Sequence, residues 1–230
     1  MLCVGQVSKP GGFAVYVVNR RPGLAVGTSM ADLAADHARA LEAEFGRPLD
    51  ILGISTGGSI ALQLAADHPE LVSRLLIAAA AYRLGPIGRE VQRRTADFAS
   101  RGQHRRAFQA SAPILAESHL GQWLLGGLLW LAAPLAVGRS WDPSNMVDTI
   151  EAEDAFDLRD RLGEISAPTL VIGGERDRAY SRELFQEIAE RIPNGRLILY
   201  EGRGHGGTIS DRRLARDVIV FLKAEQPAPR

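Results

Sequence analysis

The sequence predicts an α/β fold with a mostly parallel sheet flanked by helices. Five short apolar runs, each bounded by glycine, proline or polar residues, are typical of strands covered on both faces; they span residues 14–18, 51–54, 75–80, 169–172 and 197–200. Stretches with helical periodicity alternate with these runs, which indicates parallel strands joined by right-handed crossovers. The 230 residues, 46% of them hydrophobic, suffice for one domain with a sizeable core.

The helix expected after the first run has a recognisable start. Ser29 precedes the periodic stretch and Asp32 follows three residues later, so the two are expected to form a capping box. Similar periodicity predicts two helices near the C-terminus, around 184–188 and over 214–222. The residues expected on one face of the first helix are Met30, Leu33, Ala34, His37 and Leu41.

The pentapeptide Gly53-Ile54-Ser55-Thr56-Gly57 lies where the second apolar run breaks into a helix of small residues. A serine on such a tight strand-to-helix turn projects its hydroxyl above the edge of the sheet, as a nucleophile requires. We expect both flanking glycines to be needed, because a Cβ there would collide with neighbouring backbone. Taken alone the pattern is weak, since Ser55 is also suited to capping the helix.

Two further polar residues follow later strands, in the order that a serine nucleophile needs. Asp177 comes just after the fourth apolar run, and His205 lies in a glycine-rich loop after the fifth. An imidazole activates a serine hydroxyl, and a carboxylate fixes the tautomer of that imidazole. We therefore expect a triad of Ser55, Asp177 and His205 at the carboxyl edge of the sheet. The alternatives are a turn-forming Asp177, a surface-loop His205, and Glu175 as the acid in place of Asp177.

Three stretches carry a resemblance to a known family: GISTGGSIALQLAADHPELVSRLLI around Ser55, APTLVIGGERD ending at Asp177, and EGRGHGG around His205. Through them, residues 13–222 resemble the α/β-hydrolase superfamily, most closely its small esterase, enol-lactonase and haloperoxidase-like branch. The resemblance implies a serine hydrolase without a cofactor that cleaves a carboxylic ester or lactone through an acyl-enzyme. In it, Ser55 is the nucleophile, Asp177 the acid and His205 the base, and the Thr56 amide is an oxyanion donor.

The first twelve residues depart from the family pattern. Members normally place a strand, a His-Gly turn that gives a second oxyanion amide, and a helix before the strand that matches residues 14–18. Residues 1–12 are too few for these elements, because a parallel crossover alone takes about a dozen residues. We therefore expect the N-terminal strands and the oxyanion turn to be missing or altered, as in a shortened form. No pattern assigns Gly5 or Gln6 to the absent amide.

This departure keeps a second hypothesis open. Because non-hydrolytic proteins share the fold, the chain could be a catalytically weak or inactive hydrolase-fold protein, acting as a binding module or representing a truncated fragment.

The alternation stops between residues 81 and 165, where three or four helices are expected without a strand. We expect residues 1–80 and 166–225 to form the hydrolase core. The insertion between them resembles the mobile cap of the superfamily, which implies that it selects the substrate. Residues 226–230 are expected to be a disordered tail.

One segment of the insertion, LGQWLLGGLLWLAAPLAVG at 120–138, carries no charge. Its length approaches the roughly 20 residues of a membrane span, but a single crossing would separate Ser55 from Asp177 and His205. Pro134 and four glycines indicate a broken helix instead. We expect an apolar roof over the pocket and disfavour membrane association; the alternative is that its large side chains form the insertion's own core. The candidate substrate contacts are Trp123, Leu124, Leu128 and Trp130.

Bulk composition narrows the range of partners. Lys plus Arg and Asp plus Glu each number 27, so the formal net charge is zero and no global field attracts nucleic acid. Cys3 is the only cysteine, which excludes an internal disulfide and a thiolate metal cluster; no metal or cofactor is expected. Without the pattern of a secretory signal, the chain is expected to be cytoplasmic. The expected partner is a small apolar ester or lactone; its acyl size, the choice between ester and lactone, and homo-oligomerisation stay open.

Overall fold

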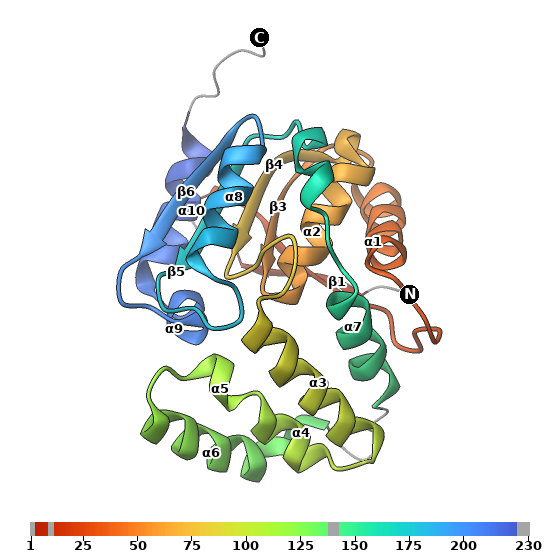
Figure 1. The fold of residues 1–230 in the computed structure, drawn as a ribbon. Helices are drawn as coiled ribbons and strands as arrows, with labels where there is room; N and C mark the ends of the chain where they lie inside the picture. Colours follow the sequence, from red (N-terminus) through yellow and green to blue (C-terminus); the bar gives the residue numbers. More distant parts are fainter. Residues whose placement is uncertain (1–2, 9–11, 138–142, 225–230) are drawn as a thin grey trace.

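The computed structural model describes residues 3–8, 12–137 and 143–224, and the tail expected at 226–230 lies outside them. At its centre is a parallel sheet, which confirms the predicted fold class. Figure 1 shows the carboxyl ends of its strands facing the α-helices formed by residues 86–137 and 144–154. The strands, in spatial order, are β3 (Leu49–Ile54), β4 (Val72–Ala78), β5 (Thr169–Gly174) and β6 (Gly195–Tyr200).

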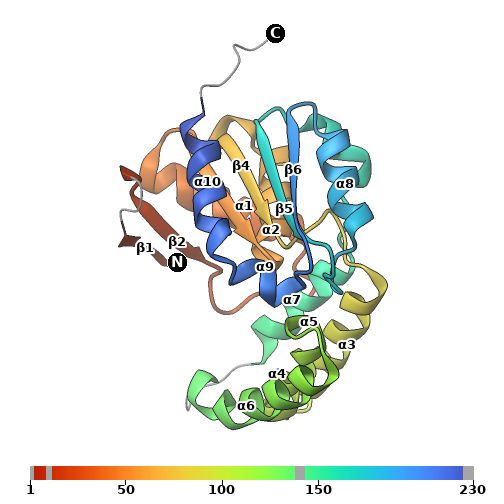
Figure 2. The ribbon, with the colours of Figure 1, turned by 90° about the vertical axis from the view of Figure 1, so that its left-hand side faces the viewer.

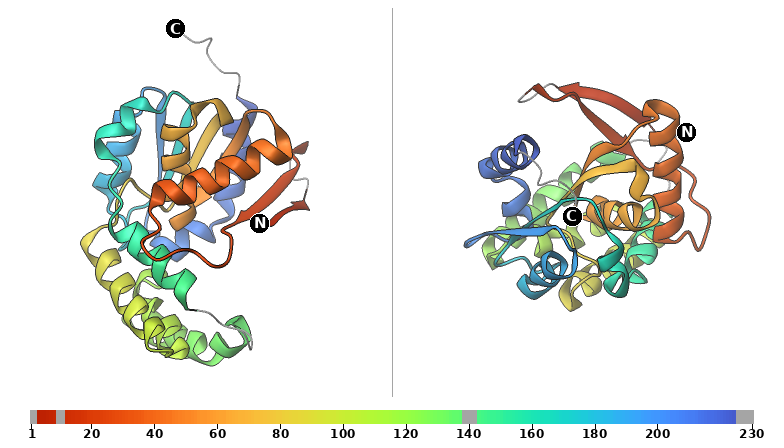
Figure 3. Two further views of the ribbon diagram at one scale, coloured as in Figure 1. Left: turned by 90° about the vertical axis from the view of Figure 1, so that its right-hand side faces the viewer. Right: turned by 90° about the horizontal axis from the view of Figure 1, so that it is seen from above.

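The helices that cover the sheet are α1 (Met30–Phe45), α2 (Thr56–Asp67), α8 (Arg182–Arg191) and α10 (Arg212–Lys223). The last of these lies over one face, and the other three lie over the opposite face (Figures 2 and 3). Alternate side chains of β4 divide between the two faces: Leu75 and Ile77 belong to the larger core, and Leu76 and Ala78 to the smaller one. Because both faces of β4 and β5 are covered, these strands are apolar along most of their length.

The predicted start of α1 is confirmed. The Asp32 N–H donates to Ser29 Oγ (3.1 Å), and the Ser29 N–H donates to Asp32 Oδ2 (2.9 Å), which completes the capping box. His37 is only half-buried, and its Nδ1 lies 2.7 Å from the Leu33 carbonyl oxygen. The buried residues of α1 are Met30, Leu33, Ala34, Ala38 and Leu41. A short 3-10 turn, η2 (Pro69–Leu71), leads from α2 into β4.

The N-terminal strand corrects one prediction. Residues 14–18 are predicted to join the parallel sheet, and this is wrong: β2 (Val15–Asn19) pairs antiparallel with β1 (Cys3–Ser8) in a separate two-stranded sheet. The short connection between these strands is long enough for a hairpin, whereas a parallel crossover needs a dozen residues or more. Gly5 and Gln6 belong to β1, so their backbone is part of the hairpin.

The hairpin lies beyond the β3 side of the parallel sheet (Figure 3). Within the described residues, β3 therefore has only β4 as a strand neighbour. Leu52 is 43% exposed and Ile54 is 37% exposed. The prediction that every apolar run is covered on both faces is wrong for this strand, because Leu52 and Ile54 lie outside the core that α10 forms with β4 and β5.

Among the described residues, five α-helices and one 3-10 helix lie between β4 and β5, more than the three or four expected. The five α-helices extend beyond the carboxyl edge of the sheet, and α5 contacts α9, whereas the 3-10 helix lies at the opposite edge against the end of α2 (Figure 1). The bounds are α3 (Pro86–Ser100), α4 (His104–Ala110), α5 (Ala112–Leu115), α6 (His119–Val137), α7 (Ser144–Asp154), η3 (Arg159–Glu164) and, after β6, α9 (His205–Ile209). We call residues 86–164 the helical insert.

The uncharged segment forms one continuous helix, α6, although Pro134 was expected to break it. Proline lacks an N–H, so the carbonyl of Trp130, four residues earlier, loses its helical donor. Arg105 Nη1 donates to that carbonyl (3.2 Å), and its guanidinium lies 4.3 Å from the centroid of the Trp130 ring. A side chain of α4 thus replaces the missing hydrogen bond. None of the helices within the described residues has the length and hydropathy of a membrane span.

Candidate active site

Ser55 occupies a strained turn between β3 and α2. Its φ of 53° and ψ of −131° lie outside the regions that non-glycine residues usually adopt. Two backbone hydrogen bonds hold it there: the Ser55 N–H donates to the Ala78 carbonyl (3.0 Å), and the Gly58 N–H donates to the Ser55 carbonyl (2.7 Å). Strain of this kind costs about 1–3 kcal/mol and persists where the surroundings enforce it, typically at functional sites.

The glycines around Ser55 differ in their steric roles. A Cβ at Gly53 would lie 2.5 Å from the Gly57 carbonyl oxygen, so the expected collision is present there. At Gly57 the expectation is wrong, because apart from its chain neighbours and the nearby backbone of α2 no described atom lies within 4 Å of a Cβ. The close approach is one residue later, where a Cβ on Gly58 would lie 2.3 Å from Ala80 Cβ. Gly58, rather than Gly57, lets α2 pack against the end of β4.

The structure brings Ser55, His205 and Asp177 into one hydrogen-bonded row. Ser55 Oγ lies 3.0 Å from His205 Nε2, and His205 Nδ1 lies 2.9 Å from Asp177 Oδ2. His205 is 3% exposed and Asp177 is 8% exposed, so the imidazole and the carboxylate meet away from bulk water. A carboxylate only accepts, so Nδ1 carries the imidazole hydrogen and Nε2 is left to accept from the serine hydroxyl.

Asp177, not Glu175, faces the imidazole. Asp177 Oδ1 accepts from the backbone N–H groups of Ala179 (2.8 Å) and Tyr180 (3.1 Å), which leaves Oδ2 directed at His205. Glu175 Oε2 instead accepts from the Gly202 N–H (3.3 Å). The two carboxylates of this loop therefore have different partners, and only one of them is placed to orient the imidazole.

The helical insert reaches the loop that carries His205. Glu117 Oε1 accepts from the Gly204 N–H (2.6 Å), just before α9 begins. A Cβ on Gly206 would lie 2.4 Å from the Leu115 carbonyl oxygen, so the backbones of α5 and α9 are in close contact. Contacts from the helical insert therefore help to position His205, in addition to the contact with Asp177 after β5.

A buried acid that the sequence analysis did not single out lies beside the serine turn. Glu153, on α7, is 1% exposed, and its carboxylate accepts four side-chain hydrogen bonds. The donors are Thr56 Oγ1 (2.8 Å), Ser59 Oγ (2.9 Å), Gln92 Nε2 (2.9 Å) and Tyr180 Oη (2.8 Å). No sequence motif marks Glu153, because its partners come from three separate segments: α2, α3 and the loop before α8.

The four candidate substrate contacts lie on the exposed face of α6, which packs on α4 and α5 at the outer end of the insert (Figure 1). The exposed fractions are 74% for Trp123, 56% for Leu124, 61% for Leu128 and 40% for Trp130. Such exposure is not that of a core, and in this structure the four side chains face solvent. Substrate contact by these residues stays a prediction.

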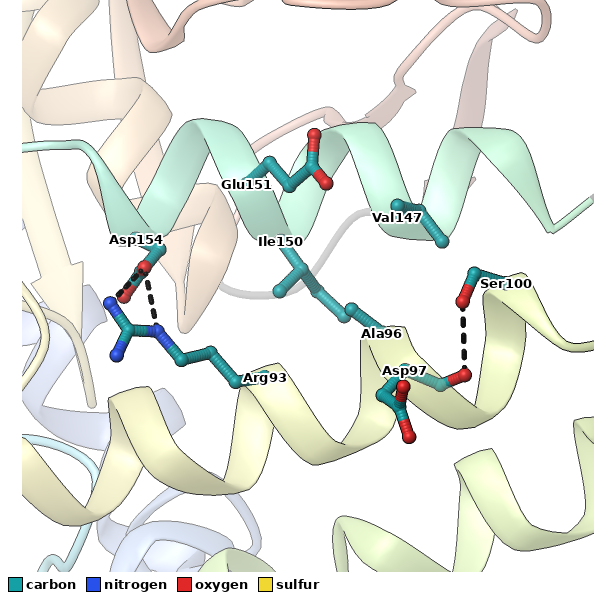
Figure 4. Close-up of a pocket in the computed structure, with 8 residues that line it drawn as sticks. All are labelled: Arg93, Ala96, Asp97, Ser100, Val147, Ile150, Glu151 and Asp154. Carbon is teal, nitrogen blue, oxygen red and sulfur yellow. Dashed lines mark hydrogen bonds and ion pairs between the residues drawn. The ribbon is translucent and has the colours of Figure 1, made fainter.

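Two surface hollows adjoin the insert. One, of about 350 Å³, lies between α3 and α7 and is lined mainly by polar side chains, with Arg93 directed at Asp154 (Figure 4). The other, of about 430 Å³, lies between the end of β2 and α1 and reaches Gly57 of the serine turn. Within the described residues, no group of three His, Cys, Asp or Glu side chains is arranged to hold a metal ion.

A serine, a carboxylate and a histidine that follow one another in this order along the chain and meet at the carboxyl edge of a parallel sheet are typical of α/β hydrolases. The sequence model of the alpha/beta hydrolase family matches residues 6–217, and the chain belongs to this family. The predicted family and the predicted class of enzyme, a hydrolase, are thereby confirmed.

The sequence identity to individual relatives is low, between 23% and 31% for the three described next. The chain is 31% identical over 212 residues to RutD of Pseudomonas savastanoi pv. phaseolicola, named as a candidate carbamate hydrolase; the match covers 86% of this chain and 80% of that protein. It is 26% identical over 191 residues to the pimeloyl-[acyl-carrier protein] methyl ester esterase of Neisseria meningitidis serogroup B, covering 78% and 70% of the two chains. The crystal structure of the enol-lactonase from Burkholderia xenovorans has the same fold, with a TM-score of 0.77, 23% identity, and coverage of 92% and 82%.

Proposed function

We propose that this chain hydrolyses a carboxylic ester or lactone of a small, largely apolar molecule through an acyl-enzyme, with Ser55, His205 and Asp177 as its catalytic triad. The observation that carries the proposal is the continuous row from Ser55 Oγ to His205 (3.0 Å) and from His205 to Asp177 (2.9 Å). One relative is named as a methyl ester esterase, which agrees with cleavage of an ester bond.

In the first half-reaction, Ser55 Oγ attacks the carbonyl carbon while His205 Nε2 takes its proton. Asp177 stabilises the imidazolium that forms. The negative charge on the carbonyl oxygen is stabilised by the Thr56 N–H, which lies at the N-terminus of α2, where backbone donors lack helical partners and the helix dipole favours an anion. The intermediate then expels the alkoxide, which takes the proton from His205; in a lactone this alcohol stays attached to the acyl chain.

In the second half-reaction, water replaces the alcohol. His205 Nε2 takes a proton from the water as its oxygen attacks the acyl carbon, and the proton passes to Ser55 Oγ as the acid leaves. The apolar face of α6, with Trp123 and Leu128, is proposed to contact the acyl or alcohol group. The large exposed apolar area of that face supports this role.

An active-site-directed fluorophosphonate probe tests the proposal. Folded wild-type protein is expected to become labelled, whereas Ser55→Ala and heat-unfolded wild type stay unlabelled. Ser100→Ala, which removes an exposed hydroxyl on α3, is the matched control and is expected to be labelled like wild type. Nitrophenyl esters of short and long acids, a set of lactones and one carbamate then define the substrate class.

Folded wild-type protein that the probe leaves unlabelled, and that turns over none of these compounds, would favour the alternative of an inactive hydrolase-fold protein. Labelling that persists in Ser55→Ala would place the nucleophile elsewhere and refute the assigned triad.

A further inference from the structure

Glu153 joins the helical insert to the serine turn from a fully buried position. It is the penultimate residue of α7, and each carboxylate oxygen accepts two hydrogen bonds. Oε1 accepts from the hydroxyls of Ser59 (2.9 Å) and Tyr180 (2.8 Å). Oε2 accepts from the Thr56 hydroxyl (2.8 Å) and the Gln92 amide (2.9 Å). Its immediate neighbour, Asp154, points outward to Arg93 instead (2.8 Å, Figure 4).

The donor set suits a negative charge. Four donors match the four acceptor positions of an ionised carboxylate, and a buried charge is tolerated only when it is bonded in this way. Burial, followed by the nearby Glu153 carboxylate, raises the pKa of the Tyr180 phenol well above its ordinary value, so Tyr180 remains a donor. Because Thr56 is the first residue of α2, the carboxylate also lies at the positive end of that helix.

Two of the donors belong to segments that carry the proposed chemistry. Thr56 supplies the oxyanion amide, and its side chain is anchored to Glu153. The Tyr180 N–H donates to Asp177 Oδ1, and the Tyr180 ring centroid lies 5.8 Å from that of His205. Gln92 adds a contact from α3 of the insert. A single carboxylate thus touches the oxyanion side and the acid side of the site without contacting the triad itself.

We propose that Glu153 is a positioning residue: its charge fixes the Thr56 amide and the Tyr180 loop in the arrangement that the transition state needs. The inference rests on the proposed function of Ser55. Glu153→Gln keeps the volume but replaces one accepting oxygen with an NH2 group, which then faces two donors. The hydroxyls that donated to that oxygen must turn to accept from the NH2 group or lose their partner, so the segments they hold are free to shift.

The expected effect is on turnover rather than on binding. Losing one oxyanion donor outright lowers kcat about 10²- to 10³-fold. A displaced donor is weakened rather than removed, so Glu153→Gln is expected to lower kcat about 10- to 100-fold, with KM changed less than about threefold. A residue that only attached the insert would change thermal stability or KM and leave kcat alone.

The experiment measures kcat, KM, the rate of fluorophosphonate labelling and the unfolding temperature for wild type, Glu153→Gln and Asp154→Asn. Asp154→Asn removes the same charge from the same helix end and is expected to retain wild-type kcat. A second pair tests the route through the hydroxyl: Thr56→Val keeps the backbone amide and the side-chain shape but cannot donate, and Thr56→Ser restores the hydroxyl. Thr56→Val is expected to lose kcat, Thr56→Ser to recover most of it, and Glu153→Gln combined with Thr56→Val to lose less than the product of the two single effects.

Glu153→Gln that is folded and labelled at the wild-type rate, while Ser55→Ala is unlabelled, would overturn this inference and leave the proposed function standing. Should Glu153→Gln fail to fold, the Thr56 pair decides: equal kcat for Thr56→Val and Thr56→Ser overturns the inference, and recovery by serine supports it. Wild-type protein that is neither labelled nor active overturns the proposed function and this inference together.

Discussion

Replacing Asp177 by asparagine is expected to abolish most turnover while leaving the fold intact. Asp177 Oδ1 accepts from two backbone N–H groups, those of Ala179 (2.8 Å) and Tyr180 (3.1 Å). An asparagine has one oxygen, and turning its NH2 group towards these two donors would leave both without an acceptor. The amide oxygen therefore takes the Oδ1 position, and the NH2 group points at His205 Nδ1.

That orientation imposes the wrong tautomer on His205. Nδ1 must now accept, so the ring hydrogen moves to Nε2, where it faces Ser55 Oγ and prevents proton transfer from the serine. In a Ser-His-Asp triad this error lowers kcat about 10⁴-fold, which corresponds to about 5.4 kcal/mol of transition-state stabilisation. Both backbone hydrogen bonds of Asp177 are retained, so the free energy of unfolding is expected to change by less than about 1.5 kcal/mol.

The assay is steady-state hydrolysis of nitrophenyl acetate, with thermal unfolding measured on the same samples. Glu175→Gln is the matched control, because it removes a carboxylate from the same loop that contacts Gly202 rather than His205. It is expected to keep kcat within about threefold of wild type. A folded Asp177→Asn variant that loses less than tenfold in kcat, or a Glu175→Gln variant that loses as much, would refute the tautomer argument.

Three shorter predictions follow from packing and charge. Gly58→Ala is expected to destabilise the fold by about 1–3 kcal/mol, because its Cβ would lie 2.3 Å from the nearest methyl group. Gly57→Ala is the control, and its free energy of unfolding in urea is expected to be unchanged or slightly raised. Equal losses in the two variants would contradict the assignment of the close contact. Hydrogen bonding by Tyr82, and then by two arginines, lowers the pKa of Glu187 to about 2. Because this folded-state pKa lies below the ordinary 4.5, ionised Glu187 stabilises the fold above pH 4.5, and this stabilisation is lost as the pH falls towards 2. The free energy of unfolding of Glu187→Gln is therefore expected to be about 1 kcal/mol below that of wild type at pH 7, and this difference should shrink between pH 4.5 and 2 in urea unfolding. A difference that stays constant would contradict the prediction. Trp123→Ser is expected to raise KM for a long-chain nitrophenyl ester about 3- to 10-fold and to leave KM for the acetate unchanged; an unchanged KM for both esters would remove α6 from the proposed substrate contacts.

The sheet and the triad-like row were predictable because each depends on local patterns that a parallel fold brings together. Buried parallel strands are continuous apolar runs, and their carboxyl ends meet at one edge. Placing Ser55, Asp177 and His205 directly after such runs was therefore enough to bring them together, although 150 positions separate the serine from the histidine. The choice of Asp177 over Glu175 is decided by two backbone amides that no sequence pattern displays.

Other features depend on contacts between distant segments and leave no pattern. A proline near the end of an apolar helix suggests a break, yet α6 continues because Arg105 of another helix bonds the carbonyl that Pro134 leaves free. No sequence pattern indicates that Glu153 is buried either, since an acid near a helix end is usually solvated. The run at 14–18 has the composition of a central strand, and only its antiparallel partner reveals a hairpin.

The serine turn itself shows why these long-range contacts matter for function. Within the described sheet, β3 has a strand neighbour on one side only, so its hydrogen bonds to β4 do not by themselves fix the position of the serine turn relative to the sheet. The remaining constraints come from α2, which packs closely on β4 through Gly58, and from Glu153, which anchors the first turn of α2 through Thr56 and Ser59. A residue held at a φ of 53° relaxes unless such constraints oppose it. The packing of α2 and the buried carboxylate therefore keep the serine in position, and loosening either one should lower turnover before it unfolds the protein.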